Sequence, residues 1–228
     1  MAGPAPFHVK RGGRRDAMAV KPRPPLSPEA FQALTGVSDD TLARLAAYVE
    51  LLGKWQRRIN LVGRRTLADV WRRHVLDSAQ LLPLLPAHTE VVLDLGSGAG
   101  FPGLVLAVMG TAPARLVEAN GRKCAFLQEV VRVTEAPAIV HNCRIEDLEP
   151  FAADVVTARA FAPLEKLLAH ARPFVAGGGL CLFLKGRTAQ RELTDSAKNW
   201  MMSVTRIDSI SDPSGVILKL EEISPRHG

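Results

Sequence analysis

Four glycines at close spacing follow an apolar run that ends in an acidic residue, within the segment Val91–Gly103. The apolar run is typical of a buried parallel strand. The glycines lack a Cβ atom, so the backbone can turn sharply and approach a ligand closely. Pro102 suits the first turn of a helix. The segment therefore predicts a strand, a tight loop and a helix start, which is how α/β proteins hold a nucleotide-like ligand.

Two glycine patterns overlap in this loop. Residues 98–103 match the dinucleotide pattern GxGxxG, and residues 94–100 match the acidic-x-G-x-G-x-G pattern of S-adenosylmethionine enzymes. A dinucleotide would place its pyrophosphate here, where the carboxylate of Asp94 repels it. The same carboxylate attracts a sulfonium and an ammonium, directly or through water. Asp94 and the glycines, Gly96 and Gly98 among them, therefore favour S-adenosylmethionine, and a nicotinamide dinucleotide is the alternative.

Two further segments indicate an adenosine. Glu118 ends the next apolar run, where a carboxylate can accept hydrogen bonds from both ribose hydroxyls, as in NAD and S-adenosylmethionine sites. In the segment Arg144–Asp147, Ile145 can cover an adenine ring, and a carboxylate or backbone group can reach its amine. These residues are compatible with both S-adenosylmethionine and a nicotinamide dinucleotide, so they do not distinguish between them.

The segment Asp154–Ala160 ends a fourth apolar run, where methyl-transfer chemistry usually takes place. The Asn/Asp-Pro-Pro-Tyr/Phe motif of amine methylases is absent, no cysteine nucleophile is present, and Arg159 stands there instead. A cation suits an acceptor that is anionic or needs no base. N7 of guanine has a free lone pair and no proton to lose, so its methylation needs positioning more than acid–base chemistry. Arg159 is predicted to position the reactants, with a strand-end salt bridge as the alternative.

Basic residues crowd the stretch between residues 54 and 74 and return after residue 184. Those predicted to contact RNA are Arg64, Arg65, Arg72, Arg73, His74, Lys185 and Arg187. Trp55 and Trp71 are interleaved with them, but both fall on apolar helical stripes and are predicted to belong to the core.

Composition narrows the class of protein. The net charge of the 228-residue chain is +6, and the whole excess of Lys and Arg lies before residue 91. This indicates a polyanionic partner or a basic solvated surface. Three scattered cysteines show neither metal-ligand spacing nor a disulfide framework. No apolar run approaches a membrane span, and no secretory signal is present. We expect a cytoplasmic protein without a metal or a membrane contact.

Helix and strand signals predict an α/β protein in three parts: a basic flexible tail (1–27), a helical cap (28–90) and a ligand-binding domain (91–228). Helices in the cap are expected to begin after Ser27 and Ser38, and a third is expected over residues 67–82. The later alternation predicts a parallel sheet with helices on both faces and an antiparallel last strand. The predicted strands are 91–95, 114–117, 138–141, 154–157, 179–184, 204–210 and 216–221, and the predicted helices are 103–109, 123–133, 163–171 and 188–200.

With these motifs, the chain resembles the small-subunit ribosomal RNA methyltransferase G family, also called the glucose-inhibited division protein B family. Four segments carry the resemblance: Ile59–Leu61, Arg73–Ser78, Val92–Gly103 and Val155–Ala160. The Gly-Phe-Pro-Gly loop, His-x-x-Asp-Ser and Thr-Ala-Arg-Ala are its specific motifs. The resemblance implies a Rossmann-like, seven-stranded class I methyltransferase sheet with an N-terminal helical cap.

The resemblance also implies an activity. The family transfers the methyl of S-adenosylmethionine to N7 of a guanosine in the decoding-region loop of 16S ribosomal RNA, so the implied partner is that RNA or the 30S subunit, and we expect a bacterial monomer. The cofactor contacts that it implies are Gly96, Phe101, Glu118, Ala119, Asn120, Ile145, Glu146 and Arg159. The helix that carries His74 and Asp77 is expected to close over the pocket. Two features depart from the family: Glu118 stands where Asp is frequent, and the tail has no clear counterpart.

Two other functions remain as alternatives. One is an NAD(P)-dependent oxidoreductase that uses the GxGxxG register, and the other is a non-catalytic, methylase-like RNA-binding module. Asp94 and the missing Tyr-Lys or His pairing disfavour the oxidoreductase. The intact Asp94, glycine loop and Glu118 disfavour the silent module.

Overall fold

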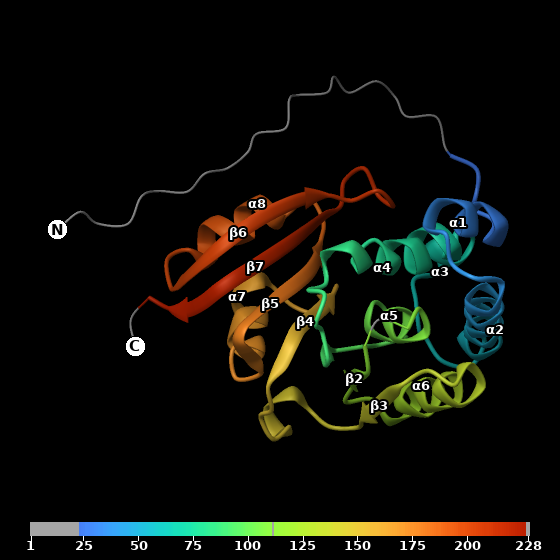
Figure 1. Ribbon diagram of the computed structural model, residues 1–228, viewed down its shortest axis with the longest axis horizontal. Coiled ribbons are helices and arrows are strands. Elements are labelled where there is room, and N and C mark those ends of the chain that lie inside the picture. The colour runs from blue at the N-terminus through green and yellow to red at the C-terminus, as the bar shows by residue number, and fades with distance from the viewer. Residues whose placement is uncertain (1–22, 111, 227–228) are drawn as a thin grey trace.

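The computed structural model describes residues 23–110 and 112–226 (Figure 1). Most of the predicted basic tail, residues 1–22, therefore lies outside the described residues. The described chain forms a sheet flanked by helices. Helices α1 (Pro28–Thr35) and α2 (Asp39–Gln56) lie at one end of the molecule, and the hairpin of β6 (Trp200–Asp208) and β7 (Val216–Pro225) lies at the other. None of the helices in these two ranges is long and apolar enough to cross a bilayer.

The described strands form one seven-stranded sheet in the order β3-β2-β1-β4-β5-β7-β6. Strands β1 to β5 pair in parallel, whereas β7 pairs antiparallel with both β5 and β6. The strands are β1 Val92–Leu95, β2 Ala114–Val117, β3 Ala138–His141, β4 Ala153–Arg159, β5 Val175–Lys185, β6 Trp200–Asp208 and β7 Val216–Pro225. The predicted class I methyltransferase sheet with an antiparallel last strand is confirmed.

Two helices begin where the sequence predicts a cap. The hydroxyl of Ser27 accepts from the N–H of Ala30, and that of Ser38 accepts from the N–H of Thr41, as Ncap residues do. The α-helices are α1 Pro28–Thr35, α2 Asp39–Gln56, α3 Arg64–Leu67, α4 Asp77–Ala79, α5 Gly103–Val108, α6 Gly121–Thr134, α7 Leu164–Ala171 and α8 Ala189–Ser196.

The single helix predicted over residues 67–82 is wrong. After α3 the chain forms the π-helical turn η1 (Trp71–Leu76), then α4 and the 3₁₀ turn η2 (Leu82–Leu84). A π-helical turn is wider than an α-turn and is frequent at functional sites. Here it buries Trp71 and Val75 in the core while His74 lines a cavity. The apolar spacing of this stretch could not reveal the wider turn.

The predicted boundary between the last helix and the hairpin is also wrong. Helix α8 ends at Ser196, and Trp200, expected at the end of a helix, begins β6. Strand β6 lies at the edge of the sheet and none of its residues is fully buried. Its alternation of apolar and polar residues is therefore weak.

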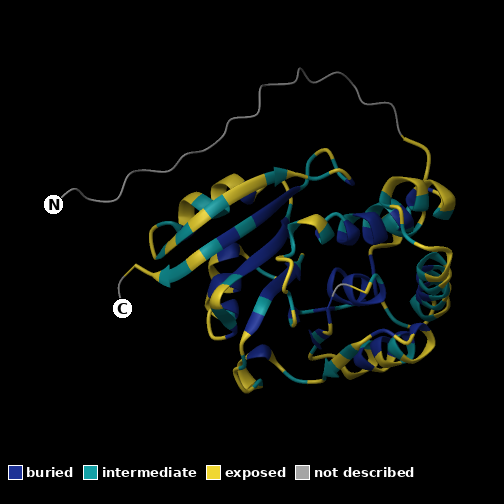
Figure 2. Ribbon diagram, viewed as in Figure 1, coloured by how far each residue is buried: buried dark blue, intermediate teal, exposed yellow. Residues whose placement is uncertain are grey.

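The helical cap and the sheet share one hydrophobic core (Figure 2). Tyr48 of α2 packs in the same cluster as Leu104 of α5 and Phe126 of α6. Trp71 is buried in this cluster and Trp55 packs against it, as predicted. The cap therefore packs on the face of the sheet that α5 and α6 also cover.

Strand β1 is buried on both faces of the sheet. Val92 belongs to a cluster with Leu106 of α5, whereas Leu93 and Leu95 pack on the other face with Leu168 of α7. This two-sided burial explains why the strand is continuously apolar. It also fixes the end of β1, from which the glycine loop begins.

Candidate active site

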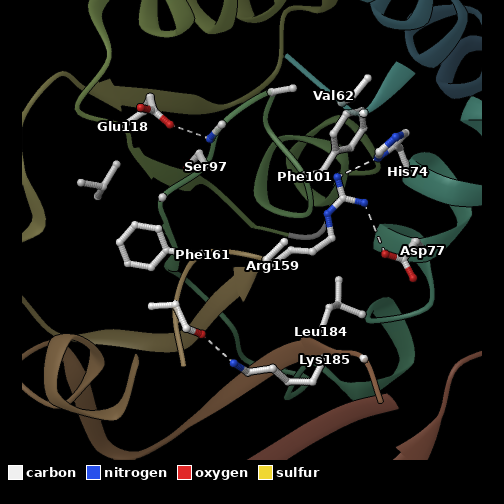
Figure 3. Close-up of a pocket in the computed structure, with 18 of the residues that line it drawn as sticks. Val62, His74, Asp77, Ser97, Phe101, Glu118, Arg159, Phe161, Leu184 and Lys185 are labelled. Atoms are coloured by element: carbon white, nitrogen blue, oxygen red, sulfur yellow. Dashed lines mark hydrogen bonds and ion pairs between the residues drawn. The ribbon is translucent and has the colours of Figure 1, made fainter. Parts of the chain in front are cut away.

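A cavity of about 1040 Å³ opens at the carboxyl ends of β1, β2, β4 and β5 (Figure 3). Open α/β sheets bind their ligands at this edge. Its volume reaches the upper end of the range of about 300–1,000 Å³ that is usual for small-molecule sites. The cavity therefore has room for more than one ligand.

The loop after β1 has the backbone that its glycines predict. Gly96, Gly98 and Gly100 have φ angles of 64°, 59° and 89°, which L-residues with side chains rarely adopt. A Cβ atom on Gly98 would meet only a backbone oxygen at 3.8 Å, so the space above this glycine is open. Gly96, Gly98 and Phe101 all line the cavity. The loop is a cradle in which a ligand can approach the backbone.

Glu118 connects the glycine loop to the end of β2. Its Oε2 accepts a hydrogen bond from the N–H of Gly98 at 2.9 Å, and its Oε1 accepts from the N–H of Asn120 at 2.8 Å. Each carboxylate oxygen has a further lone pair available, and the half-buried side chain lines the cavity. The carboxylate is thus held where it can accept hydrogen bonds from a ribose diol.

The other residues expected around an adenine lie at the same end of the cavity, with one exception. Ala119, Ile145 and Glu146 line it, and Ile145 is buried. Asn120 does not line the cavity. Its side-chain oxygen instead accepts from two backbone N–H groups at the start of α6. The side chain of Asn120 therefore caps α6, and the predicted cofactor contact of this residue stays a prediction.

Asp94 does not reach the cavity. Its side chain is fully buried, and its Oδ1 accepts a hydrogen bond from the Thr157 hydroxyl at 2.8 Å. A Cβ atom on Gly103 would lie 2.5 Å from Cβ of Asp94, so Asp94 packs directly under the start of α5. Burial raises the pKa of Asp94 to about 6, although the hydrogen bond from Thr157 opposes this rise. Asp94 therefore supports the loop from below, in place of the predicted contact with the cofactor.

Arg159 is the centre of a polar cluster between β4 and the π-helical turn (Figure 3). Its Nη1 donates to Oδ2 of Asp77 at 3.3 Å and to the carbonyl of Arg73 at 3.1 Å, and its Nη2 donates to Nδ1 of His74 at 2.8 Å. Its guanidinium carbon lies 4.9 Å from the centre of the Phe101 ring. Arg159 thus forms the strand-end salt bridge that was the alternative prediction, and it also lines the cavity, as a positioning role requires.

The ring of His74 is neutral, and its polar contacts are with other residues of the protein. Burial lowers its pKa to about 3, and the charges of Arg159 and Arg73 act in the same direction. Because Arg159 can only donate, Nδ1 accepts, and the ring proton lies on Nε2, which is 2.8 Å from the Thr66 hydroxyl. The ring also stacks on Phe101, with centroids 5.0 Å apart. His74 therefore positions Arg159, in place of the predicted contact with RNA.

Sequence reasoning missed Tyr48, which reaches the site from α2. Its ring stacks on Phe101 with centroids 5.3 Å apart, and its hydroxyl donates to the carbonyl of Ala99 in the glycine loop. Burial keeps its pKa well above the usual value, so it remains a donor. A signal was present, because Tyr48 lies on the same helical stripe as Leu45 and Leu52 and a buried hydroxyl requires a partner.

Sequence reasoning did not place the turn between β6 and β7 at the site. Arg73 forms an ion pair with Asp212 at 2.6 Å, and the Ser211 hydroxyl donates to Oδ1 of Asp77. Asp212 lines the cavity. These partners are 139 and 134 residues apart in the sequence. No local pattern could have placed them together.

One of the three cysteines, Cys143, lines the cavity. The three cysteines are free thiols. Across residues 23–110 and 112–226, no group of three His, Cys, Asp or Glu side chains is arranged to hold a metal ion.

Comparison with known proteins shows the family to which the chain belongs. A family model described as rRNA small subunit methyltransferase G matches residues 41–216. A Ribosomal RNA small subunit methyltransferase G from Paramagnetospirillum magneticum is 57% identical over 199 residues, which covers 87% of this chain and 97% of the relative. The chain belongs to the rRNA small subunit methyltransferase G family. A relative with the same name from Caulobacter vibrioides is 43% identical and covers 91% of this chain and 97% of its own.

Solved structures resemble this member of the rRNA small subunit methyltransferase G family in fold. TYW2 of M. jannaschii in complex with AdoMet has a TM-score of 0.53 at 15% identity, covering 74% of this chain and 80% of its own. A ribosomal protein L11 methylase from Lactobacillus delbrueckii has a TM-score of 0.52 at 14% identity, covering 66% and 79%. Membership in a methyltransferase family decides against the oxidoreductase and the silent RNA-binding module.

The arginines predicted to contact RNA differ in exposure in this rRNA small subunit methyltransferase G family member. Arg64 and Arg65 of α3 are exposed, as is Arg187. Arg72 and Arg73 are each paired with a carboxylate, at 3.0 Å and 2.6 Å. Three of the five arginines are therefore free to meet a phosphate without first breaking an ion pair.

Lys185 has an internal role in place of the predicted contact with RNA. Its Nζ donates to the carbonyl of Ala162 and to the Glu192 carboxylate, both at 2.7 Å. Its side chain is only 9% exposed. Lys185 thereby fixes the chain that follows β4.

Proposed function

We propose that the protein transfers a methyl group from S-adenosylmethionine to N7 of a guanosine in 16S ribosomal RNA. The names of its relatives support ribosomal RNA as the substrate. One observation carries the choice of N7: His74 and Asp77, the two titratable groups beside Arg159, are both hydrogen-bonded to Arg159. An amine or hydroxyl acceptor needs a base to remove its proton. N7 has no proton to lose, so it suits a site whose bases are engaged.

The end of the cavity formed by β1 and β2 fits the cofactor. The open space above Gly98 and the fixed carboxylate of Glu118 suit a ligand that carries a ribose. When bound, S-adenosylmethionine supplies a methyl group made electrophilic by a positive sulfur. The residues proposed to hold it are Gly96, Gly98, Phe101, Glu118, Ala119, Ile145, Glu146 and Arg159.

The proposed reaction is a direct displacement. The N7 lone pair forms a bond to the methyl carbon while the carbon–sulfur bond breaks, and its electron pair stays on sulfur. No proton moves, and the positive charge passes from sulfur to the guanine ring. The protein therefore contributes mainly alignment. Arg159 suits this task because Asp77, His74 and the Arg73 carbonyl fix its orientation.

The RNA is proposed to approach over the cap. Arg64, Arg65 and Arg187 are exposed, and Arg72 and Arg73 lie close to the first two in the chain. We assign phosphate contacts of 16S ribosomal RNA, within the 30S subunit, to Arg64, Arg65 and Arg187. The protein is proposed to act as a monomer in the cytoplasm, with residues 28–90 as the cap and residues 91–228 as the methyltransferase domain.

Mass mapping of the methylated RNA tests this function. Undermethylated 30S subunits and naked 16S ribosomal RNA are incubated with the protein and isotopically labelled cofactor. We expect one labelled 7-methylguanosine. Arg159→Ala should abolish methylation, whereas Arg191→Ala, which alters an 88% exposed side chain on α8, should not.

Other products would contradict the proposal. A label on an exocyclic amine, a ribose hydroxyl or a ring carbon would refute N7 as the acceptor. No label in either RNA substrate would refute the function itself. S-adenosylhomocysteine should raise the melting temperature and NAD should not, and the reverse result would refute the cofactor.

A further inference from the structure

Phe161 exposes an aromatic ring inside the cavity. Six large hydrophobic side chains are exposed in the described part of the chain, and Phe161, at 40%, is the one among them that lines the cavity. Phe101, in contrast, lines the cavity but is buried. The ring of Phe161 is therefore available to the apolar face of a ligand.

The backbone around Phe161 holds the ring in place. Ala160 has a φ angle of 49°, a strained conformation for a residue with a side chain. The ring packs against Gly96 so closely that a Cβ atom there would lie 2.2 Å from Cδ2 of Phe161. Lys185 fixes the next residue, Ala162, through its carbonyl (Figure 3). These contacts orient the ring before any ligand binds.

Phe161 lies between two parts of the cavity, one at the ends of β2 and β3 and the other at the ends of β5 and β7. Glu118 and Ile145 follow β2 and β3, on one side of β1, whereas Lys185 and Val216 belong to β5 and β7, beyond β4. Phe161 comes two residues after the end of β4. Neighbouring strands lie about 4.8 Å apart, so the end of β5 is about 14 Å from that of β2. An adenosine held by Glu118 leaves the part over β5 and β7 free.

We propose, building on the function proposed above, that Phe161 is the stacking surface for the target guanine in the part of the cavity over β4, β5 and β7. A base that enters such a cavity leaves its stack, and an aromatic side chain can replace the lost contact. Methylation at N7 makes the base a cation, which the face of an aromatic ring attracts. The contact strengthens as this charge develops, so it accelerates the chemical step as well as binding the base.

The neighbouring charges are compatible with a cationic base. Arg159 alone would repel it, but Oδ2 of Asp77 lies 3.3 Å from its Nη1. Lys185 is likewise paired with Glu192 at 2.7 Å. Arg159 and Lys185, two positive groups of the cavity wall, therefore carry their own counter-charges.

Replacing the ring tests the inference in the full-length protein. Phe161→Leu keeps an apolar side chain but removes the aromatic face, and Phe161→Tyr keeps the face. Phe151→Leu is the matched control, because Phe151 packs against Phe174 outside the cavity. For each variant the measurements are kcat and KM for undermethylated 30S subunits, the Kd for S-adenosylhomocysteine by calorimetry, and the melting temperature.

The expected pattern separates base stacking from cofactor binding. Phe161→Leu should lower kcat/KM by about 5- to 150-fold, with part of the loss in kcat, and should leave the Kd for S-adenosylhomocysteine unchanged. Phe161→Tyr and Phe151→Leu should retain activity. Wild-type activity in Phe161→Leu, an equal loss in Phe161→Tyr, or a matching loss of S-adenosylhomocysteine affinity would refute the stacking role. A wild-type product other than 7-methylguanosine would instead refute the proposed function.

Discussion

Two buried titratable groups near the cavity should give the protein's stability opposing responses to pH. Burial, together with the charges of Arg159 and Arg73, lowers the pKa of His74 from 6.5 to about 3. Burial raises the pKa of Asp94 from 3.8 to about 6. Replacing each residue by asparagine removes one titration while keeping a side-chain oxygen that can accept a hydrogen bond. We predict that the two variants change the pH dependence of unfolding in opposite directions.

The signs follow from which state binds more protons. Between pH 6.5 and about 3 the unfolded chain protonates His74 and the folded protein does not, so the stability contributed by His74 is lost as the pH falls. Between pH 3.8 and about 6 the folded protein protonates Asp94 and the unfolded chain does not, so the stability contributed by Asp94 is lost as the pH rises.

The pKa values give the size of each effect. On going from about pH 7.5 to about pH 5, His74 should reduce the free energy of unfolding by about 2 kcal/mol, and Asp94 should increase it by about 1 kcal/mol. The two effects oppose each other in the wild-type protein. Relative to the wild type, the same change of pH should therefore favour folding of His74→Asn by about 2 kcal/mol and disfavour folding of Asp94→Asn by about 1 kcal/mol.

Urea unfolding at the two pH values provides the measurement. The double variant is the control, because removing both titrations should return a pH dependence close to that of the wild type. If both single variants changed in the same direction, or if both followed the wild type, at least one group would not titrate as its burial requires. The reasoning about the buried polar cluster would then be refuted.

Three further predictions concern the contacts around the cavity. Tyr48→Phe should lower the free energy of unfolding by about 1–3 kcal/mol in urea titrations, because the Ala99 carbonyl loses its buried donor; an unchanged value would mean that the bond contributes nothing. Glu118→Gln should weaken S-adenosylhomocysteine binding roughly tenfold by calorimetry, because a neutral acceptor forms weaker hydrogen bonds than a carboxylate; equal affinity would remove Glu118 from the site. Arg64→Ala and Arg65→Ala should each reduce by about 1 the slope of log affinity for RNA against log salt concentration, and an unchanged slope would contradict a phosphate contact.

The part of the site that follows β1 and β2 was predictable because it is encoded locally. An apolar strand, a glycine loop and a terminal acid predict their own geometry, and the structure has the loop and Glu118 as expected. The prediction that Asp94 contacts the cofactor was wrong for a physical reason. An acid at the end of a strand has the same sequence signature whether it faces the ligand or is buried beneath the loop, and only the packing against Gly103 distinguishes the two.

The other wall of the cavity was not predictable because it is encoded by distant partners. His74 and Lys185 belong to basic stretches, and charge alone suggests solvent or RNA. Their internal roles depend on Arg159 and Glu192, which other strands and helices supply. The π-helical turn that presents His74 also lacks a periodic signature distinct from that of an α-helix.

Because β7 lies between β5 and β6 in the sheet, the sheet has an open edge at β5 until the end of the chain has been synthesised. Synthesis delivers the cap, the glycine loop and β1 to β5 first, so the nascent chain carries the outer edge of β5 unpaired until β7 arrives. That edge is long and largely apolar, and an open edge of this kind can pair with other chains. A ribosome that stops before residue 216 therefore releases a product prone to aggregation and proteolysis rather than a partly active enzyme.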